Sequence, residues 1–541
     1  MAILSRLVSF LTKSGNNFGV HRQPRHLLWV ILTLWIARST KKLISNAFFH
    51  PLSALPGNNL VASSYFLVTA AAVSGRAHHL LPFFHKRYGN VVRIGTNLVS
   101  VGDKDMIREI LVTTDLPRTE VIHRAFDFDG QQNIFSARNK DFHKIRRRQI
   151  SPAFGLRYLR SLEPILHECT QILVQKIDEI IENPRAVKHG KVLPNGHIDI
   201  GHLSVCFTVD TIGEMAFGKS FNMVNEGTHP VVEMIGKTMK RCLPHHFVPW
   251  ILPLDFSFLD YIHDRLAERK AVGTKGRADI LQHLINAQQR QRDEGIVESG
   301  DEYGDMISGK LTDKALVTEC AVFLVAGVDT SATVIGNTIM FLAKNPEKLA
   351  RLREELSLAT ASNEEGVLPL LDQIRKLPYL SACINETLRI RPIVTTGIPR
   401  EVNEDMTING YFFPKGTILL ANYPHLHWSE EHFPQPNKYI PERWIPSESP
   451  FSPVPDNVFY AFSAGARSCV GKEFAMMNLR LVIATLILLY DMERVSQECE
   501  DDILEASPGP EEGTYVLRMS RRSKKAANIM RSDSGISVTS N

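Results

Sequence analysis

The sequence predicts a mainly α-helical protein with small β-sheets, an α+β fold. Between residues 105 and 344, apolar residues recur at helical spacing in one strip after another. Residues 88–101 instead alternate apolar and polar side chains around a turn at 95–97, which indicates two strands. Further short strands are expected after residues 393–400, with turns at 409–410 and 414–416. Helices therefore form the bulk of the fold.

Length, charge and cysteine content restrict the class of protein. The chain of 541 residues is long enough for one large catalytic unit with short additions. A net charge of +4 is too small to require a nucleic-acid partner, and we expect none. Seven cysteines, an odd number, are spread far apart without a Cys-x-x-Cys pair. This usage favours a reducing compartment over a disulfide scaffold or a zinc cluster.

The N-terminal region contains a candidate membrane segment. Residues 27–37 (LLWVILTLWIA) are apolar apart from Thr33, and Arg25 and Arg38 flank them. Basic flanks and tryptophans are typical of a membrane interface. Eleven helical residues cover only about 16 Å of the roughly 30 Å of a bilayer core, so a tilted span, an interfacial helix and a cleaved signal peptide all stay open. No small-residue cleavage site follows. We favour an uncleaved anchor within residues 1–50.

The remaining boundaries follow from composition. Residues 51–57 contain Pro51, Pro56 and Gly57, which break a helix and predict a stiff hinge. We assign residues 58–520 to the catalytic domain. The segment 521–541 is basic and serine-rich, and we expect a disordered tail.

The segment 462–471 (FSAGARSCVG) is the strongest candidate for a site. Cys469 precedes a predicted helix at about 472–490, whose free N–H groups would lie near its sulfur and stabilise a thiolate. Gly465 would allow the loop to turn, and Gly471 would allow another backbone or a flat cofactor to come close. By itself, a buried core cysteine explains the pattern equally well.

Five residues of this segment resemble a known family. Phe462, Gly465, Arg467, Cys469 and Gly471 match, position for position, the haem-binding loop of the cytochrome P-450 family. The resemblance implies the fold of that family, with haem b between a long distal helix and the cysteine loop. It also implies that Cys469 is the axial iron ligand, that Arg467 bonds a haem propionate and that Phe462 packs beside the sulfur. Iron would therefore be the metal.

A second signature lies in a long predicted helix that starts at Thr312 or Asp313 and ends at Lys344. Its Ala-Gly-Val-Asp-Thr sequence places a glycine, an acid and a hydroxyl in mid-helix, which can loosen one turn and admit water. Close helix packing explains such residues equally well. In the resembling family this is the distal-helix signature, in which the threonine, here Thr330, steadies bound oxygen and its water. The acid, here Asp329, carries protons inward.

The third signature joins two distant segments. Glu386 and Arg389 lie three residues apart on a predicted helix, a spacing that is common on helix surfaces. The resemblance identifies them as the family's Glu-x-x-Arg pair and Arg443 as their partner from the Pro-Glu-Arg-Trp segment. A buried guanidinium needs carboxylate and carbonyl partners, so we expect the three side chains to form a structural network.

Two further arginines are implied to contact haem. Arg400 matches a family position whose arginine reaches a propionate. The basic run 138–148 reads first as a solvated helix face. The family carries Trp-x-x-x-Arg here, and we match it to Phe142 and Arg146, which loses one indole N–H donor. Arg146 is thus a candidate propionate ligand.

The resemblance, which spans residues 56–520, predicts a haem-thiolate monooxygenase. A thiolate ligand favours O–O bond cleavage, and an apolar small molecule is expected as substrate, in the manner of fungal enzymes of secondary metabolism. Substrate contacts are implied for 118–135, 220–260, 322–331 and 393–398. The chain shows no Gly-x-Gly-x-x-Gly or flavin-type segment.

Electrons must therefore come from another protein. Microsomal relatives use NADPH-cytochrome P-450 reductase, and the basic residues at 144–148 and Lys472 are candidates for its contact. The implied location is the endoplasmic reticulum membrane, with the catalytic domain, a monomer, facing the cytosol.

Two alternatives remain at this stage. One is a haem-thiolate isomerase or peroxide-driven enzyme that needs no reductase, although such relatives often lose Asp329 or Thr330. The other is a non-catalytic haem sensor or carrier. It would bind ligands without forming a product.

Overall fold

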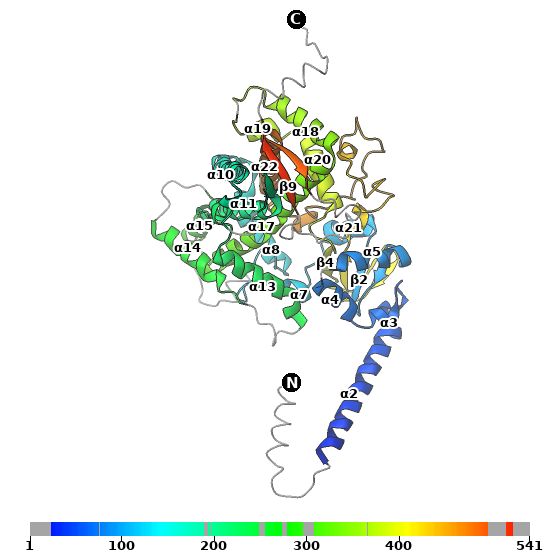
Figure 1. The fold of residues 1–541 in the computed structure, drawn as a ribbon. Helices are drawn as coiled ribbons and strands as arrows, with labels where there is room; N and C mark the ends of the chain where they lie inside the picture. The colour runs from blue at the N-terminus through cyan, green and yellow to red at the C-terminus, as the bar shows by residue number, and fades with distance from the viewer. Residues whose placement is uncertain are drawn as a thin grey trace.

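The computed structural model describes residues 23–74, 76–188, 193–194, 196–247, 255–272, 279–295, 308–364, 366–495 and 515–522. Within these ranges helices dominate and the strands form three small sheets, so the predicted α+β class is confirmed. Figure 1 shows helices throughout the molecule, with the short strands lying between them.

The longer helices are α2 (Gln23–Phe48), α4 (Phe66–Val73), α5 (Ala77–Tyr88), α8 (Lys140–Ile150), α10 (Glu163–Glu182), α11 (Ile200–Ile212), α13 (Pro230–Phe247), α14 (Phe258–Val272), α15 (Ile280–Asp293), α17 (Asp313–Lys344), α18 (Pro346–Ala359), α20 (Pro378–Ile390) and α22 (Lys472–Leu489). Short helical turns connect them: η1 (Pro51–Ala54), α3 (Asn59–Ala62), α6 (Lys104–Arg108), η2 (Glu109–Thr113), α7 (Glu120–His123), η3 (Arg124–Phe126), η4 (Ser151–Phe154), α9 (Leu156–Ser161), η5 (Pro184–Ala186), η6 (Gly213–Phe217), α12 (Met223–Glu226), α19 (Leu371–Ile374), α21 (Tyr423–His427), η7 (Pro441–Trp444) and η8 (Gly465–Arg467).

The helix α17 is the centre of the main core. It has 32 residues and begins where predicted, because the Thr312 side chain caps it by accepting a hydrogen bond of 3.1 Å from the Ala315 N–H. It packs against α11, α14, α20 and α22. Its length, about 48 Å at 1.5 Å per residue, lets it cross the whole domain.

The sheets are small and lie at the edges of this core. The largest has the order β1 (Val91–Arg93), β2 (Leu98–Val101), β7 (Ile418–Ala421), β4 (Ile398–Glu401). A second has the order β3 (His197–Asp199), β9 (Val516–Arg521), β8 (Tyr490–Arg494), and β5 (Met406–Ile408) pairs with β6 (Tyr411–Phe413). The β1–β2 hairpin and the Asn409-Gly410 turn between β5 and β6 are confirmed, the latter with φ of 47° and 80°.

The N-terminal helix is longer than its apolar run. Helix α2 has 26 residues, about 39 Å, and projects from the body of the protein in Figure 1. Its end is attached to the body, since Arg93 Nη2 donates to the Asn46 carbonyl at 2.9 Å. Trp29, Leu34 and Trp35 are each nearly two-thirds exposed.

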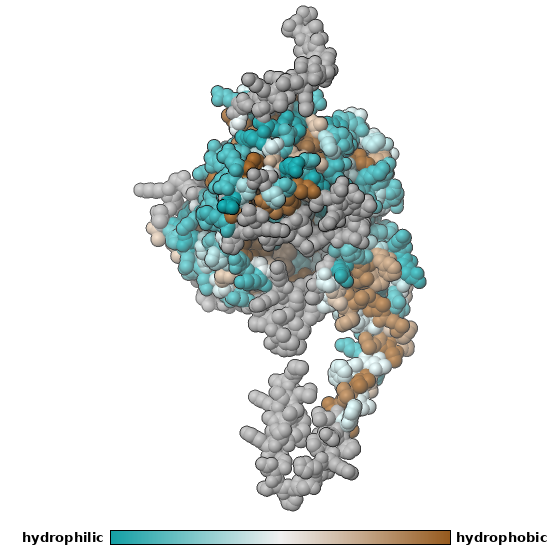
Figure 2. Space-filling view, viewed as in Figure 1, coloured by the Kyte–Doolittle hydropathy of each residue, from teal (hydrophilic) through white to brown (hydrophobic). Residues whose placement is uncertain are grey.

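An exposed apolar surface continues from this helix onto the adjoining elements. Phe49, Leu60 and Phe66 are all exposed, and Figure 2 shows this apolar surface running from α2 over the neighbouring part of the body. Among the described residues, the helix that is long and apolar enough to cross a bilayer is α17, most of which is buried in the protein core.

Three boundaries differ in detail from the prediction. The polar, acidic segment 288–310 has the composition of an exposed connector, but Gln288 belongs to α15 and is buried, where it donates to the Leu311 carbonyl at 2.6 Å. Residues 296–307 of that segment lie outside the described residues, as does the tail beyond residue 522. Arg521, assigned to the tail, is the last residue of β9. In the proposed hinge 51–57, Leu52 is fully buried.

Candidate functional site: a cysteine loop, a cation cluster and a distal helix

The loop around Cys469 is fixed by its own backbone. The Cys469 N–H donates to the Phe462 carbonyl at 2.9 Å, and the Ser468 N–H donates to the Gly465 carbonyl at 3.1 Å. Gly465 has a φ of +72°, and a Cβ at this position would lie 2.2 Å from the Leu111 carbonyl oxygen. Glycine is therefore required here by both the turn and the close approach of another backbone.

The sulfur of Cys469 lies at the start of a helix, as predicted. Helix α22 begins three residues later, and Gly471 occupies its N-cap position. Burial raises the pKa of the Cys469 thiol, whereas a hydrogen bond from the Gly471 backbone and the charges of Arg147 and Lys472 lower it. The side chain is nonetheless solvent-accessible. A thiolate here therefore needs one more positive partner, such as a metal ion.

Gly471 leaves space beside this sulfur. Within 4 Å of a Cβ built on it, the Cys469 Sγ at 3.9 Å is the one described atom. We expected Gly471 to allow either another backbone or a flat cofactor to come close. No described backbone does so, and the space leaves room for a flat group. Phe462 is half-buried against the main core, with the Lys472 ammonium 6.0 Å from its ring centroid.

A strip of accessible residues interrupts the otherwise buried helix α17. Ala326 and Asp329 are exposed, and Gly327 and Thr330 are half-buried, although the turns on both sides are buried. The helix runs through this strip without a break, and the Thr330 hydroxyl donates to the Ala326 carbonyl at 2.8 Å. The expected loosening of one turn is thus absent. Gly327 has a packing role, since a Cβ would lie 2.7 Å from Ile212 Cδ1.

The acid in this strip holds its proton more strongly than a surface aspartate. Burial raises the pKa of Asp329. Asp329 and Cys469 are therefore both closely surrounded by protein and yet accessible to solvent, as groups facing an interior space are. Helix α17, which carries Asp329, packs against α22, which begins three residues after Cys469.

Buried positive charges gather beside the cysteine loop. Burial lowers the pKa of Arg118, Arg400 and Arg467, and the charge of Arg467 lowers that of the other two further, Arg400 to about 10. Asp115 is the carboxylate that opposes them, with Oδ1 4.0 Å from Arg467 Nε. We call Arg118, Arg147, Arg400 and Arg467 the cation cluster.

Carbonyl groups satisfy only part of the cation cluster. Arg467 Nη1 donates to the Ala137 carbonyl at 2.6 Å, and Arg400 Nη1 donates to the Leu116 carbonyl at 3.2 Å. The buried Nε atoms of Arg400 and Arg467 have no hydrogen-bond partner among the described residues. Because unpaired buried charges are costly, this cluster fits a bound anionic group.

Two histidines border the cation cluster and stay neutral. Burial and the surrounding arginines lower the pKa of His143 to about 3 and that of His123 well below its usual range. Both can therefore donate one N–H without adding positive charge.

Arg146 does not lie in the cation cluster. Its Nε is 3.3 Å from Glu319 Oε1 on α17, with both side chains 1% exposed, and its Nη2 donates to the Lys310 carbonyl at 3.3 Å. Its neighbour Arg147 instead donates to the carbonyl and hydroxyl of Ser468, at 2.6 and 3.1 Å, one residue before the cysteine. Successive helical residues point about 100° apart, so Arg146 faces Glu319 while Arg147 faces the cysteine loop.

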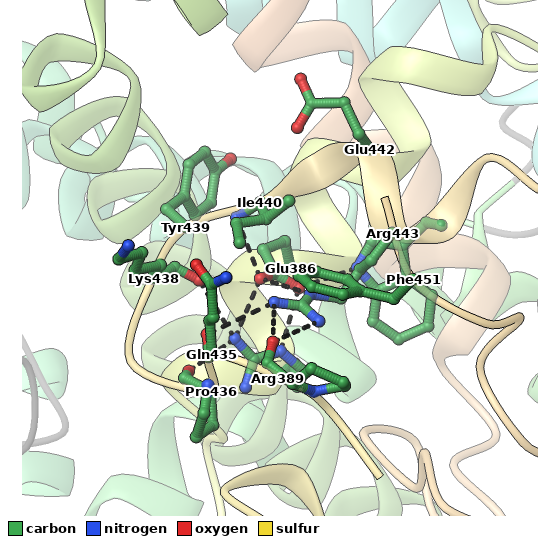
Figure 3. Close-up of polar contacts among 12 residues, drawn as sticks. Glu386, Arg389, Gln435, Pro436, Lys438, Tyr439, Ile440, Glu442, Arg443 and Phe451 are labelled. Atoms are coloured by element: carbon green, nitrogen blue, oxygen red, sulfur yellow. Dashed lines mark hydrogen bonds and ion pairs between the residues drawn. The ribbon is translucent and has the colours of Figure 1, made fainter. Parts of the chain in front are cut away.

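The expected network of Glu386, Arg389 and Arg443 is present (Figure 3). Glu386 accepts hydrogen bonds from Arg389 Nε and Nη2, both at 2.9 Å, and from Arg443 Nε at 3.0 Å. Trp444 Nε1 and the Ile440 N–H complete its contacts at 2.9 and 3.1 Å. Glu386 and Arg389 are 0% exposed. One buried carboxylate thus accepts hydrogen bonds from two guanidinium groups and neutralises one of their two charges.

The network reaches the loop 427–438 through carbonyl groups. Arg389 donates to the carbonyls of His427 and Pro436, each at 2.7 Å, and Arg443 donates to that of Pro434 at 3.0 Å. These bonds fix the chain that leads into the cysteine loop. The role is structural, as expected.

Sequence reasoning did not assign four residues to the cation cluster or its border: Arg118, His123, His143 and Arg147. It had placed the first two in a segment expected to contact substrate, and Arg147 in one expected to contact the reductase. The first two come from the segment 118–123, whose path the periodicity does not predict. The other two lie within the predicted basic run, where the local pattern does not separate Arg147 from Arg146.

Comparison with known proteins identifies the class. The family model described as cytochrome P450 matches residues 60–517. The chain therefore belongs to the cytochrome P450 family.

Curated relatives agree with this assignment. The chain is 29% identical over 497 residues to "Cytochrome P450 monooxygenase LUC2" of Fusarium sp, covering 90% of this chain and 92% of the relative. It is 28% identical to "Cytochrome P450 monooxygenase acrD" of Aspergillus aculeatus, covering 92% and 96%, and 28% identical to "Cytochrome P450 monooxygenase FUS8" of Gibberella moniliformis, covering 88% and 89%. The protein is an oxidoreductase, a monooxygenase of the kind found in fungi.

Membership of the family implies haem, and the described residues fit it. Haem carries two propionate carboxylates, and the cation cluster has buried N–H groups that lack an acceptor. Cys469 has an accessible sulfur with space beside it at Gly471. These features make this site the candidate haem site.

We expect Gly465→Ala to abolish haem loading. The methyl group would collide with the Leu111 carbonyl, and the positive φ adds about 1–2 kcal/mol of backbone strain. Gly416→Ala is the matched control, because Gly416 has a φ of +83° with no described atom within 4 Å of the new methyl group. Haem content and the thermal unfolding midpoint measure both effects. Equal haem content in the two variants would contradict the argument.

We expect Glu386→Gln to destabilise the fold by about 3–5 kcal/mol, since it leaves two buried guanidinium groups without a carboxylate. Glu448→Gln removes an ion pair with Arg351 that is more than one-third exposed, and should cost about 0–1 kcal/mol. Denaturant unfolding of both variants gives the comparison. Similar losses in free energy of unfolding would show that the network is not a special stabilising element.

Proposed function

We propose that the protein hydroxylates or otherwise oxidises an apolar small molecule, using O2 and electrons that originate from NADPH and arrive through a separate reductase. Inserting one oxygen atom and reducing the other to water takes two electrons and two protons per turnover. Bound haem supplies the iron at which O2 is activated. The observation that carries the proposal is the cation cluster, in which two buried Nε atoms have no acceptor among the described residues, beside an accessible cysteine just before a helix.

In this proposal the cysteine loop and the cation cluster hold the cofactor. Cys469 provides the thiolate, which the Gly471 N–H and the charges of Arg147 and Lys472 stabilise. Arg467 and Arg400, as expected from the sequence, bind the propionates, and Arg118 and Arg147 join them. Arg146 no longer has this role, because its charge is paired with Glu319.

The strip on α17 supplies protons. Asp329 can keep a proton at a higher pH than a surface aspartate because burial raises its pKa. The Thr330 hydroxyl donates to Ala326, which leaves its oxygen free to accept a hydrogen bond from water. Asp329 then moves the proton inward, and Thr330 orients the water that receives it.

The reductase would dock near the cysteine. Lys144, Arg148 and Lys472 are exposed, and Arg147 ties α8 to the cysteine loop through Ser468. Such a positive surface would steer an acidic partner toward the site. Buried Arg146 takes no part in this contact.

The protein would be anchored in the endoplasmic reticulum membrane with the catalytic domain in the cytosol. The exposed tryptophans of α2 and its continuity with Phe49, Leu60 and Phe66 support a membrane contact. Likeness to fungal monooxygenases supports a role in secondary metabolism.

We expect Cys469→Ser to eliminate the red-shifted Soret band of the reduced CO complex, because a hydroxyl does not replace a thiolate as an electron-donating ligand. Cys383→Ser is a control, since Cys383 is fully buried in α20 and burial raises the pKa of its thiol. An intact red-shifted band in the Cys469 variant would refute the assignment of the ligand.

We expect Thr330→Ala to raise severalfold the amount of NADPH consumed per product formed, because more of its electrons end in hydrogen peroxide. Thr338→Ala is the control: it lies on the same helix and donates to the Val334 carbonyl at 2.7 Å, but it is fully buried. The ratio of NADPH to product, measured with the reductase, decides. An unchanged ratio in the Thr330 variant would remove this residue from proton delivery.

A further inference from the structure

Glu319 is a buried acid that the proposed function leaves without a role. It lies on α17 two turns before the accessible strip and is 1% exposed. Its two oxygens each accept from the Ile134 N–H at 3.1 Å, and Oε1 is 3.3 Å from Arg146 Nε. Burial raises the pKa of Glu319 to about 7, with Arg146 opposing that rise. Burying an acid costs desolvation free energy, and an apolar side chain would make an ordinary packing contact without that cost.

The peptide groups around Ile134 are held on several sides. Its N–H donates to Glu319, and its carbonyl accepts from Arg118 Nη1 at 3.0 Å. Asn133 Oδ1 accepts from the N–H groups of Phe135 and Ser136 at 3.0 and 2.8 Å. Glu319 and Arg118 therefore clamp the loop 133–136 between the distal helix and the cation cluster.

Phe135 is the residue whose position this clamp decides. Its ring is 39% exposed and packs edge-on against Phe126, with centroids 5.0 Å apart, while the Arg118 guanidinium lies 5.0 Å from its centroid. A large aromatic ring on a fixed backbone is a rigid apolar contact for a ligand.

Helix geometry places this clamp on the face of α17 that carries the accessible strip. At 100° per residue, Ala326 is seven residues and about 20° from Glu319, and Thr330 is eleven residues and about 20° to the other side. The three residues therefore share one face, and Ala326 lies about 10 Å further along the helix. A loop bound to Glu319 is adjacent to the space above that strip.

We propose that Glu319 is a positioning residue for the substrate: by accepting the Ile134 N–H it fixes the loop 133–136 and places Phe135 against the apolar ligand above the α17 strip. The inference rests on the proposed function, since it concerns the same site. Arg146 compensates the charge of Glu319 and so allows this acid to be buried. The acceptor oxygen of Glu319 is the feature that positions the loop.

Matched double variants separate the effect of the acceptor oxygen from the effect of the charge pair. Glu319→Gln/Arg146→Met removes both charges and keeps an acceptor for the Ile134 N–H, whereas Glu319→Leu/Arg146→Met removes the acceptor as well. Replacing both members of a buried ion pair avoids an unpaired charge. Phe135→Ala, made alone and added to the leucine variant, tests the end point of the clamp without touching the pair.

The probes are imidazole and 4-phenylimidazole, titrated into the haem-loaded full-length protein and followed by the shift of the Soret band. Imidazole binds iron without extending toward the loop, whereas the phenyl group of 4-phenylimidazole extends into the space above the haem. We expect the glutamine variant to bind both probes like the wild type. The leucine variant should bind 4-phenylimidazole about tenfold more weakly, the order expected for loss of a buried hydrogen bond, with imidazole affinity unchanged.

Phe135→Ala should weaken 4-phenylimidazole by a similar factor and add nothing further in the leucine background, because both changes remove the same contact. Three outcomes would overturn the proposal: equal 4-phenylimidazole affinity in the leucine and glutamine variants, fully additive losses on adding Phe135→Ala to the leucine variant, or an imidazole affinity that falls as much as that for 4-phenylimidazole.

If the leucine variant does not load haem, Phe135→Ala alone still tests the proposal. An unchanged 4-phenylimidazole affinity in this variant would overturn it, and a tenfold loss would support it. A wild-type protein without any Soret shift on adding imidazole would instead refute the haem site itself.

Discussion

The structure depends on a group of buried guanidinium groups that the nearby carboxylate, Asp115, neutralises only in part. Of these arginines, Arg400 and Arg467 each have a buried Nε that lacks an acceptor among the described residues. Elsewhere the protein supplies acceptors for its buried guanidinium groups, as Glu386 and backbone carbonyls do for Arg389 and Arg443. The contrast between a closed network and an open one distinguishes a structural element from a ligand site.

The elements around the cation cluster serve to hold it and the cysteine in register. The network at Glu386 fixes the chain that leads into the cysteine loop, and Gly465 lets that loop touch the backbone of Leu111. Helix α17 is buried along nearly all of its length, but it is accessible at Ala326 and Asp329. Asp329 thus lies on α17, and the Cys469 sulfur lies three residues before α22, which packs against α17.

Glu319 and Arg146 connect these parts across the distal helix. Their pair joins α8 to α17, and the Ile134 amide joins both to the loop that carries Phe135. Since the Ile134 carbonyl accepts from Arg118 while its N–H donates to Glu319, this one residue links the cation cluster to α17 through the two peptide groups on either side of it. The loop 133–136 is consequently held by charged side chains at both of these peptide groups.

The sequence by itself determined the helical class, the limits of α17, the glycine-dependent turns and the identity of Cys469, Arg467, Asp329 and Thr330 as candidates. These follow from local rules of periodicity, capping and turn conformation, or from a motif within ten residues. The tertiary structure decided which arginine faces which partner. Arg146 and Arg147 differ by one position in the chain, and only the packing of α8 against α17 and the cysteine loop turns the first toward Glu319 and the second toward Ser468. Long-range contacts of this kind leave no trace in local pattern, because both residues are equally basic and equally helical.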